Sequence, residues 1–539
     1  MRREFFLLLS LWILLSVAAW FWLPGFLWTW IIVGPLALIG IRDTLVVRRT
    51  ILRNFPVIGN FRYLFEMIRP EIQQYFIESD RDGVPFNREQ RSVVYQRSKR
   101  ELDTLPFGTR EDVYRTGYEW VNHSMQPRHV EPQQMRLTIG GSACHRPYDA
   151  SLLNISAMSF GALSARAVTA LNRGAAAGRF AQNTGEGGIS EWHRQGGDLI
   201  WQIGTGYFGC RREDGTFDGD RFREKAAAPE VKMIEIKISQ GAKPGHGGIL
   251  PGAKVTPEIA AIRGVPLGRD VLSPPAHSAF DTPRGLLEFV GRLRELSDGK
   301  PVGFKICVGK RREFLAICKA MVATGIQPDF IVVDGGEGGT GAAPLEFANY
   351  IGSPLKEALI FVHNALMGFG LRDSTRIIAA GRISSAFEIV TYLALGADLC
   401  YAARAFMLSL GCIQALRCNA NDCPAGIATH RPELVRGLSV PHKEERVCTW
   451  HGETMEAVAE MIGAMGLGEH GELRPWHIMR RTGPNSVAHY GEIHRFLQEG
   501  ELTGESLPPD WARAVLAASP DTFASVGAAT SKTRLIPMG

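Results

Sequence analysis

Hydrophobic residues follow two patterns along this chain, and the first occupies its amino-terminal end. No charged residue occurs among the 37 residues from Phe5 to Ile41. Residues 5–23 are apolar except for two serines, and these 19 residues match the ~20 that a helix needs to cross a bilayer. Pro24-Gly25 then indicates a turn, and residues 26–41 form a second apolar run. The pattern predicts a hairpin of two transmembrane helices.

Basic residues flank this hairpin on both sides and indicate its orientation. Arg2 and Arg3 precede it, and four arginines follow it: Arg42, Arg48, Arg49 and Arg53. Because loops rich in lysine and arginine stay in the cytoplasm, we expect both ends of the hairpin and the body of the chain to be cytoplasmic. Two alternatives stay open. One is a cleaved signal peptide of the twin-arginine type, and the other is a second run that re-enters the membrane, since it contains Pro35.

The second pattern begins near residue 150, where short β-rich runs alternate with helical stretches. The runs are 153–158, 180–183, 233–238, 270–273, 302–308, 329–334, 375–380 and 398–402. Amphipathic stretches separate most of them, among them Pro283–Leu296, Arg311–Thr324 and residues 384–395. Several runs are apolar almost throughout, as strands covered on both faces should be. Eight such units predict an α/β fold, a (β/α)8 TIM barrel, and a doubly wound sheet is the alternative.

Polar, glycine-rich clusters follow five of these runs. They are residues 159–161, 183–188, 241–245, 273–275 and 335–341. In a barrel the loops that follow the strands lie on one face, and that face carries the active site. Residues 336–341 also read G-x-G-x-x-G, but they follow the sixth run instead of opening a βαβ unit, and no acidic strand end follows them at the expected distance. A nicotinamide site is therefore disfavoured.

The end of the predicted barrel offers groups that suit a phosphate. Such folds often bind phosphate through the loops after strands seven and eight. Gly381 follows the seventh run, and Ala403 and Arg404 follow the eighth. Backbone N–H groups and a guanidinium suit a phosphomonoester such as that of FMN, and an ordinary loop with a surface arginine is the alternative.

Charge and composition narrow the classes of function. The chain has 539 residues, with 60 Lys and Arg against 55 Asp and Glu, a net charge of +5. Residues 1–110 contain 15 basic and 10 acidic residues, so the whole excess lies there and the other 429 residues balance. A nucleic-acid-binding domain would have a basic face, so that class is excluded. The arginine-rich connector, with a helix expected near residues 61–76, suits anionic headgroups, and a solvated linker is the alternative.

Three of the nine cysteines are grouped near the end of the predicted barrel. Cys412, Cys418 and Cys423 precede Pro424. An odd number of scattered cysteines does not form a secreted disulfide framework, and grouped thiolates in a reduced compartment are typical of metal sites. Three thiolates fit a [3Fe–4S] cluster. A four-iron cluster with an outside ligand, zinc with His430, and three structural thiols are the alternatives.

Five stretches together resemble the FMN-binding synthase domain of glutamate synthase. They are residues 156–164, 183–188, 235–245, 338–342 and 411–428, and their order, spacing and glycine placement agree with the family over residues 150–435. The membrane-anchored branch of the family is the most similar. The resemblance implies a barrel that binds FMN beside a [3Fe–4S] cluster held by Cys412, Cys418 and Cys423.

The resemblance also assigns roles to single residues. The family's flavin contacts correspond to Ser159, Thr184, Lys305, Gly381, Ala403 and Arg404, and its substrate-binding charges correspond to Glu186, Lys237, Lys243 and Arg263. Two lysines and an arginine suit the carboxylates of 2-oxoglutarate, while the flavin would supply hydride to an imine carbon. The alternative to a substrate-binding role is that each lysine is simply a solvated or ion-paired residue at a strand end.

Two segments depart from the family pattern. Ile249 stands where the family has Gln before Leu-Pro-Gly, and residues 277–282 read His-Ser-Ala-Phe-Asp-Thr where the family has His-His-Asp-Ile-Tyr-Ser. Both segments lie near the family's 2-oxoglutarate site. Losing a Gln and a Tyr removes hydrogen bonds to an imino-dicarboxylate, which leaves room for a different substrate.

We expect four regions: a transmembrane hairpin (1–41), a charged connector (42–149), an FMN-binding barrel with an iron–sulfur loop (150–435) and a helical C-terminal extension (436–539). The expected function is reduction of an imino acid, by default 2-iminoglutarate, at a bacterial-type inner membrane. The alternatives are an amine or N-methyl amino-acid dehydrogenase, and an electron-transfer module without its own substrate. Because no amidotransferase or nicotinamide domain is recognised, we expect partner proteins to supply ammonia and electrons, with free ammonia or a different reaction as the alternatives.

Overall fold

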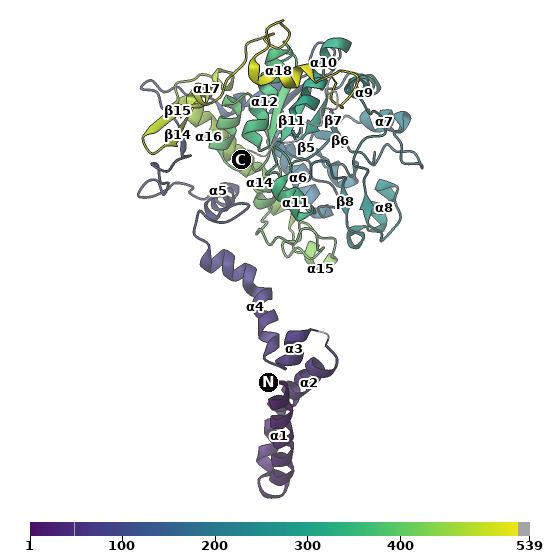
Figure 1. The fold of residues 1–539 in the computed structure, drawn as a ribbon, viewed down its shortest axis with the longest axis vertical. Helices are drawn as coiled ribbons and strands as arrows, with labels where there is room; N and C mark the ends of the chain where they lie inside the picture. Colours follow the sequence, from purple (N-terminus) through teal and green to yellow (C-terminus); the bar gives the residue numbers. More distant parts are fainter. Residues whose placement is uncertain (48, 527–539) are drawn as a thin grey trace, which may run out of the picture. The chain divides into compact units, whose positions relative to one another are not determined.

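The computed structural model describes residues 1–47 and 49–526, and the chain divides into two compact units, Met1–Glu89 and Gln90–Gly539. Arg48, one of the flanking arginines, and residues 527–539 of the predicted extension lie outside the described residues. Figure 1 shows the ribbon of the chain and labels many of its helices and strands.

The first unit begins with two apolar helices where the sequence predicts them. α1 (Arg2–Trp22) and α2 (Trp30–Leu45) are joined by the short 3-10 helix η1 (Pro24–Thr29). The indole N–H of Trp30 donates to Ser16 Oγ at 2.7 Å and ties the two helices together. Both apolar segments, Arg2–Trp22 and Pro24–Leu45, are long and apolar enough to cross a membrane, a property that a signal sequence shares. α3 (Thr50–Asn54), α4 (Gly59–Ile72) and the π-helical turn η2 (Gln73–Ile77) follow, so the helix expected near residues 61–76 is present.

The second unit is built around a closed barrel of eight parallel strands, which confirms the predicted TIM barrel. Its strands are β4 (Leu153–Ile155), β5 (Gln182–Asn183), β6 (Leu199–Ile203), β7 (Val231–Lys237), β10 (Val302–Ile306), β11 (Phe330–Asp334), β12 (Arg376–Ala380) and β13 (Leu399–Ala402). The barrel closes where β13 pairs with β4, through Tyr401 and Asn154. All strand residues except Lys232 and Arg376 are buried, as the apolar runs indicate.

Helices between the strands cover the outside of the barrel. They are α6 (Ala165–Gly178), α7 (Gly219–Ala226), α9 (Pro283–Leu296), α10 (Arg311–Thr324), α12 (Leu355–Gly368), α13 (Ala386–Ala394) and α14 (Arg404–Ser409). α9 has the predicted bounds because the Thr282 hydroxyl caps its first turn and Pro283 occupies its first position. α10 ends as predicted because Gly325 takes a left-handed conformation.

One predicted barrel strand is wrong. Residues 270–273 form β9 (Val271–Leu272), which pairs antiparallel with β8 (Ile249–Leu250) outside the barrel. The third barrel strand is instead β6, which the sequence analysis missed. No α-helix separates β5 from β6, only the turn η4 (Glu191–His193), so the strand–helix alternation that reveals the other strands is absent there. The cluster at residues 273–275 therefore lies in the long connection between β7 and α9.

Further elements precede, interrupt and follow the barrel. They are α5 (Arg88–Lys99), β1 (Glu119–Val121), β2 (Arg136–Ile139), β3 (Tyr148–Ser151), α8 (Pro257–Arg263), α11 (Leu345–Tyr350), α15 (Pro432–Val435), α16 (Val440–Ala464), β14 (Ile478–Gly483), β15 (Ser486–His489), α17 (Tyr490–Ile493) and α18 (Pro509–Leu516). The C-terminal extension thus combines helices with a β-hairpin, whose strand β14 also pairs with β1. Its long helix α16 packs closely on α6, where a Cβ at Gly174 would lie 2.5 Å from the Val447 side chain.

Candidate active site

Four charged side chains meet at the carboxyl end of the barrel. Glu186 lies in the loop after β5, Lys237 ends β7, Lys243 lies in the loop after β7, and Arg263 ends α8. Lys237 Nζ lies 2.7 Å from Glu186 Oε1, and these side chains are only 9% and 17% exposed. The charges of Lys243 and Arg263 also act on Glu186. The structure therefore brings together all four residues that the resemblance associates with substrate, and we call them the ion cluster.

Two glycines leave room for the ion cluster. A Cβ atom on Gly248 would lie 2.6 Å from Glu186 Oε1, and one on Gly187 would lie 2.8 Å from Arg263 Nη2. Real Cβ atoms do not approach other atoms this closely, so any larger residue would displace the charged groups. Gly187 lies in the polar, glycine-rich run at residues 183–188. Because it has no side chain, the Arg263 guanidinium can lie against its backbone.

Burial and neighbouring charges set the protonation of the ion cluster. Burial alone would raise the pKa of Glu186, but the Lys237 ammonium, with Lys243 and Arg263, lowers it overall, so Glu186 is a carboxylate. Burial, together with the nearby Lys237, lowers the pKa of Lys243 to about 8. Burial also lowers the pKa of Arg263 to about 10. At neutral pH three cations surround one carboxylate, and this excess of two positive charges suits a dicarboxylate.

Arg263 joins the ion cluster to the loop after β4. Its Nη2 donates to Ser159 Oγ at 3.3 Å and to the carbonyl oxygen of Phe160 at 3.1 Å. Its guanidinium carbon lies 5.1 Å from the centroid of the Phe208 ring, within the range of a cation–π contact. Ser159, one of the predicted flavin contacts, therefore touches the ion cluster directly. Phe208 was missed, because its loop carries no motif.

Tyr207 and His277 hold the end of β7 beside the ion cluster. His277 Nε2 lies 2.9 Å from the carbonyl oxygen of Lys237, and His277 Nδ1 lies 3.0 Å from the Tyr207 hydroxyl. Because a carbonyl only accepts, Nε2 is assigned the proton and Nδ1 accepts from the tyrosine O–H. Burial lowers the pKa of His277 to about 4, so the ring is neutral. In the sequence, His277 is marked only as part of a departure from the family pattern, and no motif marks Tyr207.

A second buried ion pair lies on neighbouring barrel strands. Lys305 Nζ on β10 lies 3.1 Å from Asp334 Oδ2 on β11. Asp334 also accepts from the backbone N–H of Gly241 at 2.9 Å, which positions the loop that carries Lys243. Burial alone would lower the pKa of Lys305, but Asp334 and Glu235 raise it. Lys305, a predicted flavin contact, therefore stays protonated inside the barrel.

The loops after β11, β12 and β13 meet where the sequence predicts a phosphate. Gly381 follows β12 with a φ of +138°, and a Cβ there would lie 3.2 Å from the backbone nitrogen of Gly335. Arg404 Nη2 donates to the carbonyl oxygen of Glu337 at 2.9 Å, and a Cβ on Gly339 would lie 2.6 Å from Arg404 Nε. Glycines thus allow backbone and guanidinium to converge, and this donor set fits a phosphate group.

Thr184 and Ala403 complete the predicted flavin contacts. Thr184 Oγ1 donates to the Gly185 carbonyl at 3.0 Å and accepts from the Gln202 N–H at 3.1 Å, which joins the end of β5 to β6. Ala403 lies directly between β13 and α14. All six predicted flavin contacts therefore lie at or next to the carboxyl ends of barrel strands, and their donor types fit FMN.

The three grouped cysteines lie beyond α14. Burial, with a smaller contribution from the thiols of Cys418 and Cys423, raises the pKa of Cys412 to about 12, so the three groups lie within electrostatic range of one another. Among residues 1–47 and 49–526, however, no three His, Cys, Asp or Glu side chains are arranged so that they could hold a metal ion. The donor type fits an iron–sulfur cluster, in which each thiolate binds a different iron atom and the three sulfurs need not converge on one ion.

Two side chains tie the cysteine loop to the loop after β4. The ammonium of Lys254 donates to the carbonyl oxygens of Cys418 at 2.7 Å and Ala162 at 3.1 Å. His430 Nε2 lies 2.8 Å from the Gly161 carbonyl oxygen, so this nitrogen bonds the backbone. The cysteine loop is thereby fixed next to the loop after β4, through contacts of Lys254 and His430 that the sequence did not reveal.

The strand ends of the barrel thus carry buried cations and phosphate-type donors, a combination suited to anionic ligands. The chain belongs to the glutamate synthase family, since residues 112–468 match the family model described as the conserved region in glutamate synthase. Its relatives are oxidoreductases named for glutamate synthesis, which act on CH–NH2 donors, and membership in this family supports FMN as the cofactor.

Individual relatives match over different shares of the chain. Glutamate synthase large subunit-like protein YerD of Bacillus subtilis is 36% identical over 504 residues, which are 86% of this chain and 95% of that protein. The archaeal glutamate synthase (NADPH) of Methanocaldococcus jannaschii is 34% identical over 359 residues, 66% of each protein. The archaeal-type enzyme of Thermotoga maritima is 35% identical over 321 residues, 59% of this chain and 60% of that protein. The chain thus spans nearly all of YerD but less than two thirds of the enzymes named NADPH-dependent.

Proposed function

We propose that this protein is an FMN-dependent oxidoreductase that reduces a 2-imino dicarboxylate to an amino acid. The default substrate is 2-iminoglutarate, formed from 2-oxoglutarate and ammonia. The observation that carries the proposal is the ion cluster, in which two lysines and an arginine surround one carboxylate at the mouth of the barrel. A buried excess of two positive charges is costly unless a dianion binds there.

The proposed roles follow from the contacts of each residue. Lys243 and Arg263 bind the substrate carboxylates, and Glu186 holds Lys237 Nζ at the site. Arg404 and the backbone near Gly381 would hold the phosphate of FMN, and Lys305 would supply a buried cation to the bound flavin. FMN, when bound, supplies hydride transfer. Tyr207 and His277 act by positioning the backbone of Lys237.

A specific observation favours a second candidate, an amine or N-methyl amino-acid dehydrogenase. Both departures from the family pattern, Ile249 and residues 277–282, lie in the connection between β7 and α9 that also carries Lys243 and Arg263. That connection could therefore contact a substrate with a different side chain while Lys243 and Arg263 still bind its carboxylate. A pure electron-transfer module is disfavoured, because it needs no buried clamp of this kind.

Binding of 2-oxoglutarate to the full-length protein in detergent tests the proposal. Denatured protein should release FMN, and 2-oxoglutarate should perturb the flavin absorbance. Lys243→Gln should weaken this binding by about tenfold or more, the value of a charge-assisted hydrogen bond. Lys232→Gln is the matched control, because Lys232 lies on the same strand as Lys237 but is 37% exposed and pairs with Asp198. The proposal would be contradicted, and the second candidate supported, if 2-oxoglutarate left the flavin absorbance unchanged while an N-methyl amino acid reduced the flavin.

We also propose that Cys412, Cys418 and Cys423 hold a [3Fe–4S] cluster. The three thiols within electrostatic range, and the bonds that tie their loop to the strand-end site, support it. Protein purified without oxygen should contain about three iron atoms per chain. Cys418→Ser should lose most of this iron, whereas Cys448→Ser, a change on α16, should not. Full iron in the Cys418 variant would refute the assignment.

The amino-terminal unit is proposed to anchor the protein in a bacterial inner membrane with the barrel in the cytoplasm. Two apolar helices of sufficient length and the flanking arginines support this. Electrons and ammonia are proposed to come from partner proteins.

A further inference from the structure

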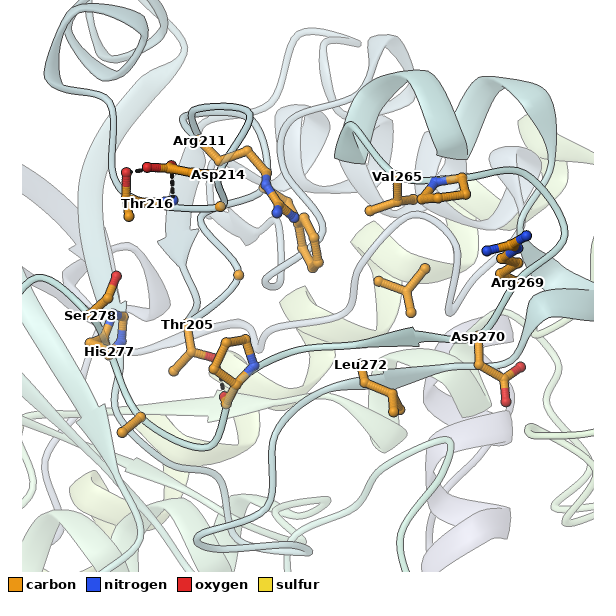
Figure 2. A pocket seen from close by; sticks show the side chains of 17 residues that line it. Thr205, Arg211, Asp214, Thr216, Val265, Arg269, Asp270, Leu272, His277 and Ser278 are labelled. Carbon is orange, nitrogen blue, oxygen red and sulfur yellow. Dashed lines mark hydrogen bonds between the residues drawn. The ribbon is translucent and has the colours of Figure 1, made fainter.

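A pocket of about 580 Å3 opens beside the ion cluster, and none of the four cluster residues lines it. Its walls are the loop after β6 and the segment that runs from the end of α8 through β9 to Ser278 (Figure 2). Thr205 Oγ1 donates to the carbonyl oxygen of Pro274 at 2.6 Å and joins the two walls. The pocket is therefore built by two loops that are fixed to each other at the barrel mouth.

Two arginines give the pocket its charge. Arg211 and Arg269 come from different walls and lie on opposite sides of the hollow in Figure 2. The guanidinium carbon of Arg211 lies 5.6 Å from the centroid of the Phe208 ring. Within the described part of the chain, the Arg269 guanidinium makes no hydrogen bond or ion pair. Both cations are thus available to a ligand.

Two carboxylates also line the pocket, and both are engaged by the protein. Asp214 accepts hydrogen bonds from the backbone N–H of Thr216 at 2.9 Å and from its hydroxyl at 2.7 Å. Asp270 Oδ1 accepts from the backbone N–H of Gly252 at 2.7 Å. These bonds turn the acidic groups toward backbone and hydroxyl donors, so an anion in the hollow meets mainly the arginines.

The rest of the lining is largely apolar. Val265, Pro266, Leu272, Pro274 and Phe208 supply most of it. An inorganic anion would leave this surface uncovered, whereas a carboxylate with an aliphatic or aromatic body would bury it and gain from the hydrophobic effect. The lining therefore selects for an organic anion of modest size.

We propose that this pocket is a second ligand site, which binds a small monocarboxylate with an apolar body between Arg211 and Arg269. Phe208, which lines the pocket, contacts both Arg211 of the pocket and Arg263 of the ion cluster. His277 also lines the pocket and bonds the Lys237 carbonyl, so these two aromatic side chains lie between the two sites. The site is distinct from the dicarboxylate clamp, and its existence does not depend on the reaction that the ion cluster supports.

Equilibrium dialysis of phenylacetate against the full-length protein with its cofactors tests the proposal. Phenylacetate should bind, and Arg211→Gln and Arg269→Gln should each weaken binding by about tenfold. Arg212→Gln is the matched control, because Arg212 is exposed in the same loop and does not line the pocket. Phenethylamine, which carries the opposite charge on a similar body, should not bind.

The same measurement separates the pocket from the ion cluster. Phenylacetate binding should persist with saturating 2-oxoglutarate and in Lys243→Gln. The proposal would be overturned if 2-oxoglutarate or Lys243→Gln abolished phenylacetate binding while Arg211→Gln and Arg269→Gln left it unchanged. That result would place phenylacetate in the ion cluster. Absence of binding to the unmodified protein, or equal binding of phenethylamine, would overturn it as well. Failure of the proposed glutamate reaction would leave these outcomes unchanged.

Discussion

At the scale of single residues, the charge of Lys243 is the feature that pH should alter most directly. Its pKa of about 8 means that the free protein loses this ammonium as the pH rises through 8, whereas an ordinary lysine keeps its charge to about pH 10. We predict that affinity for 2-oxoglutarate falls by up to about tenfold between pH 7 and pH 9. Titrations of flavin absorbance at each pH measure this. Lys243→Arg should keep its affinity across the range, since a guanidinium stays protonated. A flat profile for the unmodified protein would contradict the assignment.

The pairing of Glu186 with Lys237 makes a prediction about stability. Lys237→Met leaves a buried carboxylate without its closest partner and should cost about 3 kcal/mol, the lower end for a broken buried ion pair, because Lys243 and Arg263 also face Glu186. Urea unfolding in detergent measures the loss. Adding Glu186→Gln to Lys237→Met should restore part of it, because no buried charge is then left alone. A double variant less stable than the single one would show that the pair is not the source of the effect.

The charged residues of the site were predictable from sequence, but their partners were not. Glu186, Lys237 and Lys243 stand within motifs whose spacing is visible along the chain. Arg263 lies outside these motifs and was assigned through the resemblance to the family. Phe208, Tyr207 and Asp334 act through contacts between loops of different strands, and such contacts exist only once the barrel has closed. Sequence motifs and the family resemblance therefore identified the charges but not the residues that orient them.

At the scale of elements, the contact between α6 and α16 depends on a glycine. A Cβ on Gly174 would lie 2.5 Å from Val447 Cγ1, so Gly174→Ala should destabilise the protein by about 1–3 kcal/mol through overpacking. Gly452→Ala on α16 is the matched control, because no atom lies within 4 Å of its Cβ position. That change should instead stabilise by about 0.5–1 kcal/mol, the helix preference for alanine. Equal effects of the two substitutions in urea unfolding would contradict this packing.

Sequence patterns predicted the bounds of some helices accurately but misplaced one barrel strand. α9 and α10 were predicted to the residue, because each has a residue that begins or ends a helix. β6 was missed and residues 270–273 were wrongly placed in the barrel, because a short β-rich run looks the same inside a barrel and in a hairpin. Only the pairing of β9 with β8 distinguishes them. The count of eight strands was right, although one of its members was wrong.

At the scale of the whole molecule, the uneven charge makes a prediction about membrane attachment. The excess of basic residues lies in residues 1–110, around two helices long and apolar enough to span a bilayer. We predict that the full-length protein stays with the membrane pellet after extraction at alkaline pH, and that its mature amino terminus is the encoded one. Extraction followed by mass spectrometry of the intact chain measures both. A shortened amino terminus would support the signal-peptide alternative and contradict the anchor.

The central claim, that this barrel reduces an imino dicarboxylate, is tested most directly by the reoxidation of its reduced flavin. The full-length protein is reduced without oxygen, and its flavin absorbance is followed after addition of 2-oxoglutarate and ammonium, each alone and both together. The account predicts that only the combination reoxidises the flavin, with one glutamate formed per flavin. A flavin that stays reduced in the presence of both would contradict the account.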